Sequence, residues 1–174
     1  MRNIGIIGIL SILVLIVALS GCTSTNTYNA NGVSFNYPTS WQQYSSPNTG
    51  ALVAVGDPNS KDNSTGNPTS IVVIQSIPLP SGENMKQVYD ANYAQFSSSL
   101  TNYKTISENT TTVDGTTAYV NVHSFDNNGV TTQEEAVWLS KNNNIYVILC
   151  SALQSNFASQ QDNFNMIINS FKVQ

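Results

Sequence analysis

Residue types that often carry chemistry are scarce in this chain, which has one histidine and two cysteines. On a strand, the histidine, His123, would share a face with Tyr119, Asn121 and Phe125. A zinc site needs further His or Cys ligands, which a lone histidine lacks. A Ser-His-Asp arrangement stays open because Ser and Asp are plentiful, although no Gly-x-Ser-x-Gly segment marks a nucleophile. We therefore expect a structural or surface role for His123.

The adjacent carboxylates Glu134 and Glu135 are the second candidate for chemistry. Neighbouring residues on a strand point to opposite faces, so these two cannot serve one substrate as general acid and base. We predict that one faces water and the other faces a helix or the rim of the sheet.

Segment 57–68 superficially resembles a calcium loop, because it contains Asp57, Asn59 and Asp62. An EF-hand needs Gly at its sixth position and Glu at its twelfth, and here those positions hold Asp62 and Pro68. The sequence therefore predicts no metal site, and it contains no phosphate-binding or dinucleotide-binding motif that would predict a cofactor.

Cys22 ends a segment with the order of a secretory signal. Arg2 is followed by an apolar run over residues 4–19 and then by Ser20-Gly21-Cys22. Leu19-Ser20-Gly21-Cys22 resembles the lipobox of prokaryotic lipoproteins. The resemblance implies cleavage before Cys22 and a diacylglyceryl group on its sulfur, and two acyl chains are enough for stable anchoring.

An uncleaved membrane helix is the alternative interpretation of the same segment. Its apolar run is short for a bilayer span, which needs about 20 residues. Arg2 would hold the N-terminus inside and send the rest of the chain out. Both interpretations place the protein at the cell membrane, facing outside the cytoplasm.

The other cysteine, Cys150, ends an apolar run over residues 145–150. With Cys22 lipidated it has no disulfide partner. Nothing nearby would lower its pKa, so we expect a buried, inert thiol.

Charged residues make up only 9% of the chain, and Asn, Ser, Thr and Gln dominate its polar surface. The six basic residues include Arg2, which leaves five lysines against ten acidic residues after Cys22. Nucleic-acid binding and basic membrane docking both need clustered Lys and Arg, so both are excluded.

Alternating and continuous apolar runs predict strands over residues 33–37, 51–55 and 71–77. Four more are expected at 104–113, 117–125, 131–140 and 145–152, separated by the turn signals Asp114-Gly115, Asn127-Asn128-Gly129 and Asn142-Asn143-Asn144. Asn31-Gly32 signals an earlier hairpin, whose first strand begins as early as Thr27. The polar segment 56–69 is predicted to be a mobile loop.

Two helices are expected. One is capped by Ser81, runs for about five turns and carries Met85, Val88, Tyr89, Asn92, Phe96 and Leu100 on one stripe. The other is capped near Ser155 and carries Phe157, Phe164, Ile167, Ile168 and Phe171.

These elements predict an α+β fold, an antiparallel β-sheet sandwiched by helices. The predicted organisation is a lipoprotein signal peptide at 1–21, the lipidated Cys22 and a short tether at 22–31, and a single domain at 32–174.

The segment 32–41 (GVSFNYPTSW) looks like the opening of PsbP-like domains, with a Gly, an alternating strand, Pro38 and then Trp41. The element order of the mature chain also matches that fold, which is known as the Mog1/PsbP fold. The resemblance implies a helix-covered antiparallel sheet and a non-catalytic accessory role. No metal or partner residue of the plant members has a matching position here.

The candidate interaction surface consists of Trp41, Tyr44, Asp57 and Asp62, although packing explains Trp41 equally well. Trp138 is explained by core burial about as well as by binding. Glycosylation of the sequon residues Asn63 and Asn109 stays open.

The leading hypothesis is a non-catalytic, lipid-anchored accessory domain that binds another envelope protein. The alternatives are a lipoprotein that binds a small ligand in a pocket and, third, a hydrolase that uses Ser or carboxylates, which needs His123 or a Glu with a perturbed pKa in a cleft.

Overall fold

The computed structural model describes residues 24–45, 50–62, 65–127 and 129–174. In chain order its elements are β1 (Thr25–Ala30), β2 (Val33–Pro38), β3 (Gln42–Tyr44), β4 (Ala51–Gly56), β5 (Ile71–Pro78), α1 (Met85–Ser99), β6 (Thr101–Val113), β7 (Thr116–Asn127), β8 (Val130–Lys141), β9 (Asn144–Leu153), α2 (Gln154–Ser170) and β10 (Lys172–Val173). Neither helix in this described part of the chain is long and apolar enough to cross a membrane.

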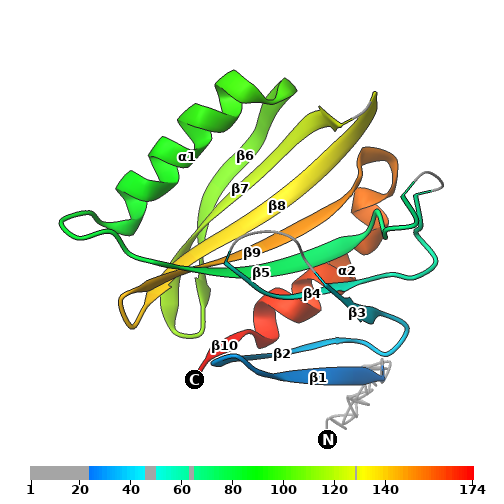
Figure 1. Ribbon diagram of the computed structural model, residues 1–174, viewed down its shortest axis with the longest axis horizontal. Helices are drawn as coiled ribbons and strands as arrows, with labels where there is room; N and C mark the ends of the chain where they lie inside the picture. Colours follow the sequence, from blue (N-terminus) through cyan, green and yellow to red (C-terminus); the bar gives the residue numbers. More distant parts are fainter. Residues whose placement is uncertain (1–23, 46–49, 63–64, 128) are drawn as a thin grey trace, which may run out of the picture.

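The strands form two antiparallel sheets. The large sheet has the order β3-β4-β5-β9-β8-β7-β6, and the small sheet has the order β1-β2-β10. Helix α1 lies on one face of the large sheet, while α2 lies on the other face with the small sheet beside it (Figure 1). The predicted fold class, an antiparallel sheet sandwiched by helices, is confirmed.

Three hairpins turn at the dipeptides Asn31-Gly32, Asp114-Gly115 and Asn142-Asn143. Both central residues of each turn have positive φ, between 49° and 73°. Two positive φ values define the type I′ turn, whose twist suits the flanking strands and which favours Asn, Asp and Gly. The meander predicted over β6–β9 is therefore present, with each turn where its signal lies.

The main core fills the space between α2, the hairpin β1–β2 and one face of the large sheet. The predicted stripe of α2 lies in it, with Phe164, Ile167 and Phe171 fully buried. Burying one large apolar side chain contributes about 1.5–3 kcal/mol to stability. This stripe therefore holds α2 firmly between the two sheets.

Helix α1 begins three residues later than predicted and is shorter. Its N-cap is Asn84, whose side chain accepts from the Gln87 amide while the Gln87 side chain accepts from the Asn84 amide. Ser81 cannot cap it, because Gly82 follows with φ +84° and the chain turns there instead of entering a helix. The helix has 15 residues, about four turns. The start of α2 also differs slightly, since it follows β9 directly at Gln154 without a side-chain cap.

The segment predicted as a tether is largely part of the fold. β1 begins at Thr25 and pairs with β2 along its whole length. The short strands β3 and β10 were not predicted; two or three residues are too few to show alternation. Cys22 lies outside the described residues, three positions before β1.

Asp114 joins the two sheets at the end where the chain terminates. Its carboxylate pairs with Lys141 at the end of β8 and, at 3.4 Å, with Lys172 of β10, and it also accepts from the Val173 amide at 3.0 Å. Burial alone would raise the pKa of Asp114, but the hydrogen bonds from Lys141 and Val173 lower it below its usual value. The charged form is therefore the one that stabilises the fold.

We expect Asp114→Asn to lower the free energy of unfolding by about 1.5–3 kcal/mol at pH 7, because hydrogen bonds to a charged group are lost. Asn tolerates the positive φ, so the turn itself should persist. Because the pKa of Asp114 is lower in the folded protein, its carboxylate stabilises the fold at pH values above the unfolded pKa, and this contribution is lost as the pH falls. The difference in stability between wild type and Asp114→Asn should therefore shrink by pH 3. Urea unfolding at both pH values measures it.

Asp90→Asn is the matched control. Asp90 pairs with Lys86 one helical turn away, but both side chains are about half exposed. Such exposed pairs contribute little, and we expect a loss of at most about 0.5 kcal/mol. Equal losses for the two variants would contradict the role given to Asp114.

Candidate functional site

The interface between α1 and the large sheet is polar and aromatic, unlike the apolar interface beneath α2. The Tyr89 hydroxyl of α1 donates to Glu108 of β6 at 2.7 Å. The Asn121 side chain of β7 donates to the same Glu108 oxygen at 3.1 Å and to the Tyr89 hydroxyl at 3.3 Å. Burial and this carboxylate raise the pKa of Tyr89, so the phenol stays protonated. Three elements are thus joined by one polar group of side chains.

His123 continues this group and is fully buried, with 0% of its surface exposed. Its ring is surrounded by aromatic rings at centroid distances of 5.3–6.3 Å, from Tyr93, Phe96, Tyr103 and Phe125. As predicted, Tyr119, Asn121, His123 and Phe125 occupy one face of β7.

The tautomer of His123 follows from its neighbours. Asn121 uses its amide nitrogen to donate to Glu108, so its oxygen faces His123 Nδ1 at 2.9 Å and must accept from it. Nδ1 therefore carries the proton of the neutral ring. Nε2 has no hydrogen-bond partner in the described part of the chain and lies 3.5 Å from a carboxyl oxygen of Glu134.

Glu134 lies between His123 and Ser151 in the sheet, since it pairs with both across neighbouring strands. Ser151 donates its hydroxyl proton to Glu134 at 2.7 Å. In a hydrolytic triad the imidazole stands between the hydroxyl and the carboxylate and removes the hydroxyl proton. Here the carboxyl stands between them, so His123 cannot activate Ser151.

Burial moves both ionisable groups of this pair toward their neutral forms. It lowers the pKa of His123 to about 4. It also raises the pKa of Glu134, against the opposing hydrogen bond from Ser151. At neutral pH His123 is therefore an uncharged imidazole, and the Glu134 carboxyl is a stronger proton acceptor than an exposed one but is buried beside that ring.

Glu135 points to the opposite face of β8, where Gln161 of α2 donates to it at 2.8 Å. The two adjacent carboxylates thus lie on opposite faces of the sheet, as predicted. The prediction that one of them faces water is wrong, because a helix covers each face and both side chains are only partly exposed. Cys150 is buried beside them. Its burial is the main cause that raises the pKa of its thiol, and the nearby charges of Glu135 and Glu134 raise that pKa further. No group of three His, Cys, Asp or Glu side chains within residues 24–45, 50–62, 65–127 and 129–174 is placed to hold a metal ion.

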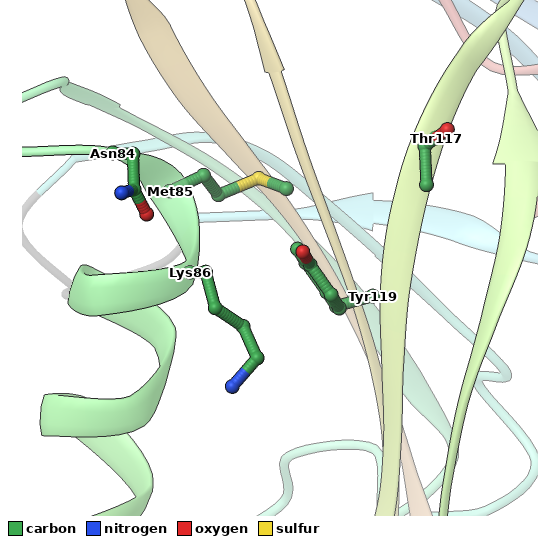
Figure 2. A pocket seen from close by; sticks show the side chains of 5 residues that line it. All are labelled: Asn84, Met85, Lys86, Thr117 and Tyr119. Atoms are coloured by element: carbon green, nitrogen blue, oxygen red, sulfur yellow. The ribbon is translucent and has the colours of Figure 1, made fainter.

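An open pocket of about 460 Å³ lies at the N-terminal end of α1, against β7. Its lining residues come from these two elements and are Asn84, Met85, Lys86, Thr117 and Tyr119. Met85 and the Tyr119 ring extend toward one another across it (Figure 2). The Lys86 ammonium lies 6.0 Å from the centre of the Tyr119 ring and 5.8 Å from that of Tyr89, so a cation–π contact borders the pocket.

Trp41 must be removed from the candidate interaction surface. Its side chain is only 3% exposed and packs edge-on against Phe164 of α2, because β3 starts beside the main core. Tyr44 and Asp57 are partly exposed, but they lie toward opposite ends of the β3–β4 pairing, since Tyr44 pairs with Ala54 while Asp57 follows Gly56, the partner of Gln42. Trp138 is likewise a core residue.

Asp57 and Asp62 hold the turns of their own loop. Asp57 accepts from the Asn59 amide at 2.9 Å, and Asp62 accepts from the Thr65 amide at 2.8 Å. Lys61 and Pro68 form a β-bridge across the loop. The described part of this loop, predicted to be mobile, is thus closed on itself by hydrogen bonds; Asn63 lies outside it.

Several residues of the α1 interface were missed from sequence. Tyr93 is buried and accepts from the Trp138 indole at 3.1 Å, and Glu108 is the hub of the polar group. Tyr93 lies four residues after Tyr89, and this helical spacing could have predicted that both tyrosines lie on the same face of α1. Nothing local marked Glu108, which depends on the register of β6 with β7.

The lowered pKa of His123 predicts a loss of stability as the pH falls. An unfolded histidine takes up its proton near pH 6.5, whereas the folded one does so near 4, so acid favours the unfolded chain in that window. The full shift corresponds to about 3 kcal/mol. We expect His123→Gln, which cannot be charged, to remove this share of the pH dependence in urea unfolding between pH 7.5 and 4.

Because the chain has one histidine, NMR titration follows the same group directly. Its imidazole should titrate with a midpoint near 4 in the folded protein and near 6.5 in urea. A folded midpoint of 6 or above would contradict the burial argument.

Comparison with known proteins places this geometry in a family. No curated protein matches the chain by sequence. Among solved structures it is similar to cyanobacterial PsbP (CyanoP) of Synechocystis, with a TM-score of 0.64 and 16% identity over 89% of this chain and 95% of that one. It is similar to LpqN of Mycobacterium tuberculosis, with a TM-score of 0.60 and 14% identity over 86% and 90%.

The Ran-binding protein Mog1p of Saccharomyces cerevisiae has the same fold, with a TM-score of 0.57 and 10% identity over 87% of this chain and 96% of that one. At these identities the likeness shows the fold alone. The family model of PsbP-like proteins matches residues 16–173, nearly the whole sequence. The chain therefore belongs to the PsbP-like protein family.

Proposed function

We propose that this protein is a non-catalytic accessory domain, anchored outside the cytoplasm by a lipid on Cys22, which binds another protein of the cell envelope. The lipobox-like segment 19–22 supports the anchor. The family and the surface beside α1 support the binding role. The observation that carries the non-catalytic part is the complete burial of His123.

A lipid on Cys22 would hold the domain close to the bilayer. Only Thr23 and Ser24 separate Cys22 from β1, and two extended residues span about 7 Å. β1 lies on the side of the molecule far from α1 (Figure 1). The small sheet would therefore face the headgroups and leave the α1 interface and its pocket for a partner.

Two relatives support a protein partner in the envelope. LpqN is described as involved in cell envelope biogenesis, and Mog1p as a Ran-binding protein. Transfer of either property to this chain rests on the shared fold, which by itself is an associational argument. The present proposal takes from LpqN only the place, the cell envelope, and from Mog1p only the class of role, binding of another protein.

Small-ligand binding is the second candidate function, and the pocket favours it. Its volume of about 460 Å³ lies within the range of ligand sites, and Met85, Tyr119 and Lys86 combine apolar, aromatic and charged contacts. A hydrolase has less support, because the Ser151–Glu134–His123 order prevents activation of the hydroxyl.

We expect Cys22→Ala to abolish lipidation, because the acceptor sulfur is lost. Incorporation of radiolabelled lipid measures the effect. Ser20→Ala is the control, since it keeps a small residue and the sulfur. Labelled lipid in the Cys22→Ala protein would show that the lipobox interpretation is wrong.

The partner is tested by photo-cross-linking in native membranes. We expect a benzoylphenylalanine placed at Tyr44 or at Tyr119, both partly exposed, to cross-link one envelope protein in proportion to the amount of this chain. Cys22→Ala should weaken that cross-link, because the anchor raises the local concentration of the two proteins.

Absence of a cross-link at both positions would contradict the accessory role. A small molecule that copurifies with wild type and is lost from Tyr119→Ala would instead establish the ligand-binding candidate.

A further inference from the structure

β6 is the last strand of the large sheet, and one half of it presents a free, regular edge. Among the described residues it pairs only with β7. Sheet edges are normally blunted by bulges, charges or short strands, because a free edge recruits other chains. The two halves of β6 differ in this respect.

The N-terminal half of β6 is blunted. Its register with β7 shifts between Thr101 and Lys104 and again between Thr105 and Ser107, as β-bulges do. Asn102 has a positive φ, and Lys104 adds a charge. The opposite end of the large sheet, β3, is only three residues long.

The C-terminal half lacks these protections. Residues 107–113 (SENTTTV) pair with β7 in unbroken register. They contain three consecutive threonines and no proline, and their one charge, Glu108, is hydrogen-bonded to Tyr89 and Asn121. β-branched residues in an extended, uncharged stretch favour pairing with another strand.

The turn at Asp114-Gly115 fixes which backbone groups face outward. In a two-residue hairpin the flanking residues, here Val113 and Thr116, exchange both hydrogen bonds, and the pattern then alternates. The amides and carbonyls of Thr112, Thr110 and Glu108 therefore point away from β7. No described residue forms a hydrogen bond with them.

The pocket lies beside this edge on the same face of the sheet. Its residues Tyr119 and Thr117 are the register partners of Thr110 and Thr112. A strand added to β6 would direct side chains opposite Thr110 and Thr112 toward that face. Thr110 and Thr112 are exposed and short, and the pocket beyond them is lined by Met85 and Tyr119, so a long side chain of the added strand would lie beside it.

We infer that residues 107–113 of β6 bind an extended segment of a partner protein by strand addition, with one aromatic or Met side chain of that segment entering the pocket at Tyr119. Backbone hydrogen bonds would give affinity, and the pocket would give specificity. This inference rests on the proposed partner-binding function and names the surface and the form of the partner.

A second copy of this chain fits the edge less well. Antiparallel pairing about Thr110 would place Thr110 against Thr110 and Glu108 against Thr112 on the face of the pocket. The threonines are too short to fill the pocket, and Glu108 is already hydrogen-bonded to Tyr89 and Asn121 of its own chain. A partner segment can supply the large side chain that the pocket accepts. We therefore expect the free protein to be monomeric by sedimentation.

The test uses a phage-displayed library of random linear dodecapeptides, selected on the full-length lipidated protein in phospholipid nanodiscs. We expect selected peptides to alternate β-branched residues with one aromatic or Met. Thr110→Pro should weaken their binding at least tenfold, because it removes an outward amide while sparing the bonds to β7. Tyr119→Ala should remove the preference for the large residue.

Thr27→Pro is the matched control. By the same count from the Asn31-Gly32 turn, the Thr27 amide also faces outward, at the free edge of β1. The affinity of the Thr27→Pro variant for the selected peptides should stay within twofold of the wild-type affinity. Amide exchange should slow at Glu108, Thr110 and Thr112 on peptide binding, and unchanged exchange at Thr111 in free Thr110→Pro verifies that the ladder to β7 persists.

Failure to select any peptide, or peptides whose binding Thr110→Pro leaves intact, would overturn the strand-addition site. A dimer of the free protein that Thr110→Pro dissolves would overturn the assignment to a partner and give the edge to a second copy. If the Thr110→Pro variant still cross-links the envelope protein in membranes, the proposed partner-binding function stands, and only the β6 edge is excluded as its binding site.

Discussion

The fold depends on β9 being hydrogen-bonded on both sides and buried on both faces. β9 joins β5 to the meander through eight register pairs on one side and ten on the other. Ile148 and Cys150 enter the core beneath α2, while Ile145 and Val147 enter the layer beneath α1. A strand with both faces apolar can exist only if each face is covered, and the chain supplies a helix for each.

The two helices meet this requirement in different ways. α2 covers its face with large apolar side chains such as Phe164 and Ile167. The interface under α1 contains two buried polar atoms without hydrogen-bond partners among the described residues, His123 Nε2 and Asn92 Oδ1, and Ser70 Oγ before β5 is a third such atom. Each such atom costs about 1–3 kcal/mol, and two of the three belong to the interface under α1.

The sequence predicted most of the sheet because the signals for it are local. Asn-Gly, Asp-Gly and Asn-Asn pairs mark turns through the φ values that these residues tolerate, and alternation marks the faces of the strands between them. The fold class and the stripe of α2 followed directly, and the resemblance in segment 32–41 agreed with them. The cap of α1 was misplaced because serine is a residue type that often caps helices. The positive φ of Gly82, which the sequence does not reveal, prevents a helix from starting after Ser81.

The candidate site was less predictable, because it depends on register and not on local pattern. His123 was correctly placed on a face of β7, but its cage includes Tyr93 and Tyr103 from two other elements. Glu108 reaches Asn121 only because β6 is bulged on one side of it and regular on the other. Trp41 has the residue type of an exposed anchor, and only the position of α2 shows that it is covered.

The scarcity of charge explains why the structure of its edges matters to this protein. With 9% charged residues, the surface has few lysines to keep strands from pairing with other chains. The chain relies instead on geometry, with short strands at β3 and β10 and bulges in the first half of β6. Residues 107–113 have neither protection, and they run beside the pocket. A free edge next to a recess is the arrangement that strand recognition requires, and in a protein with so little charge it is the feature best able to distinguish one partner from another.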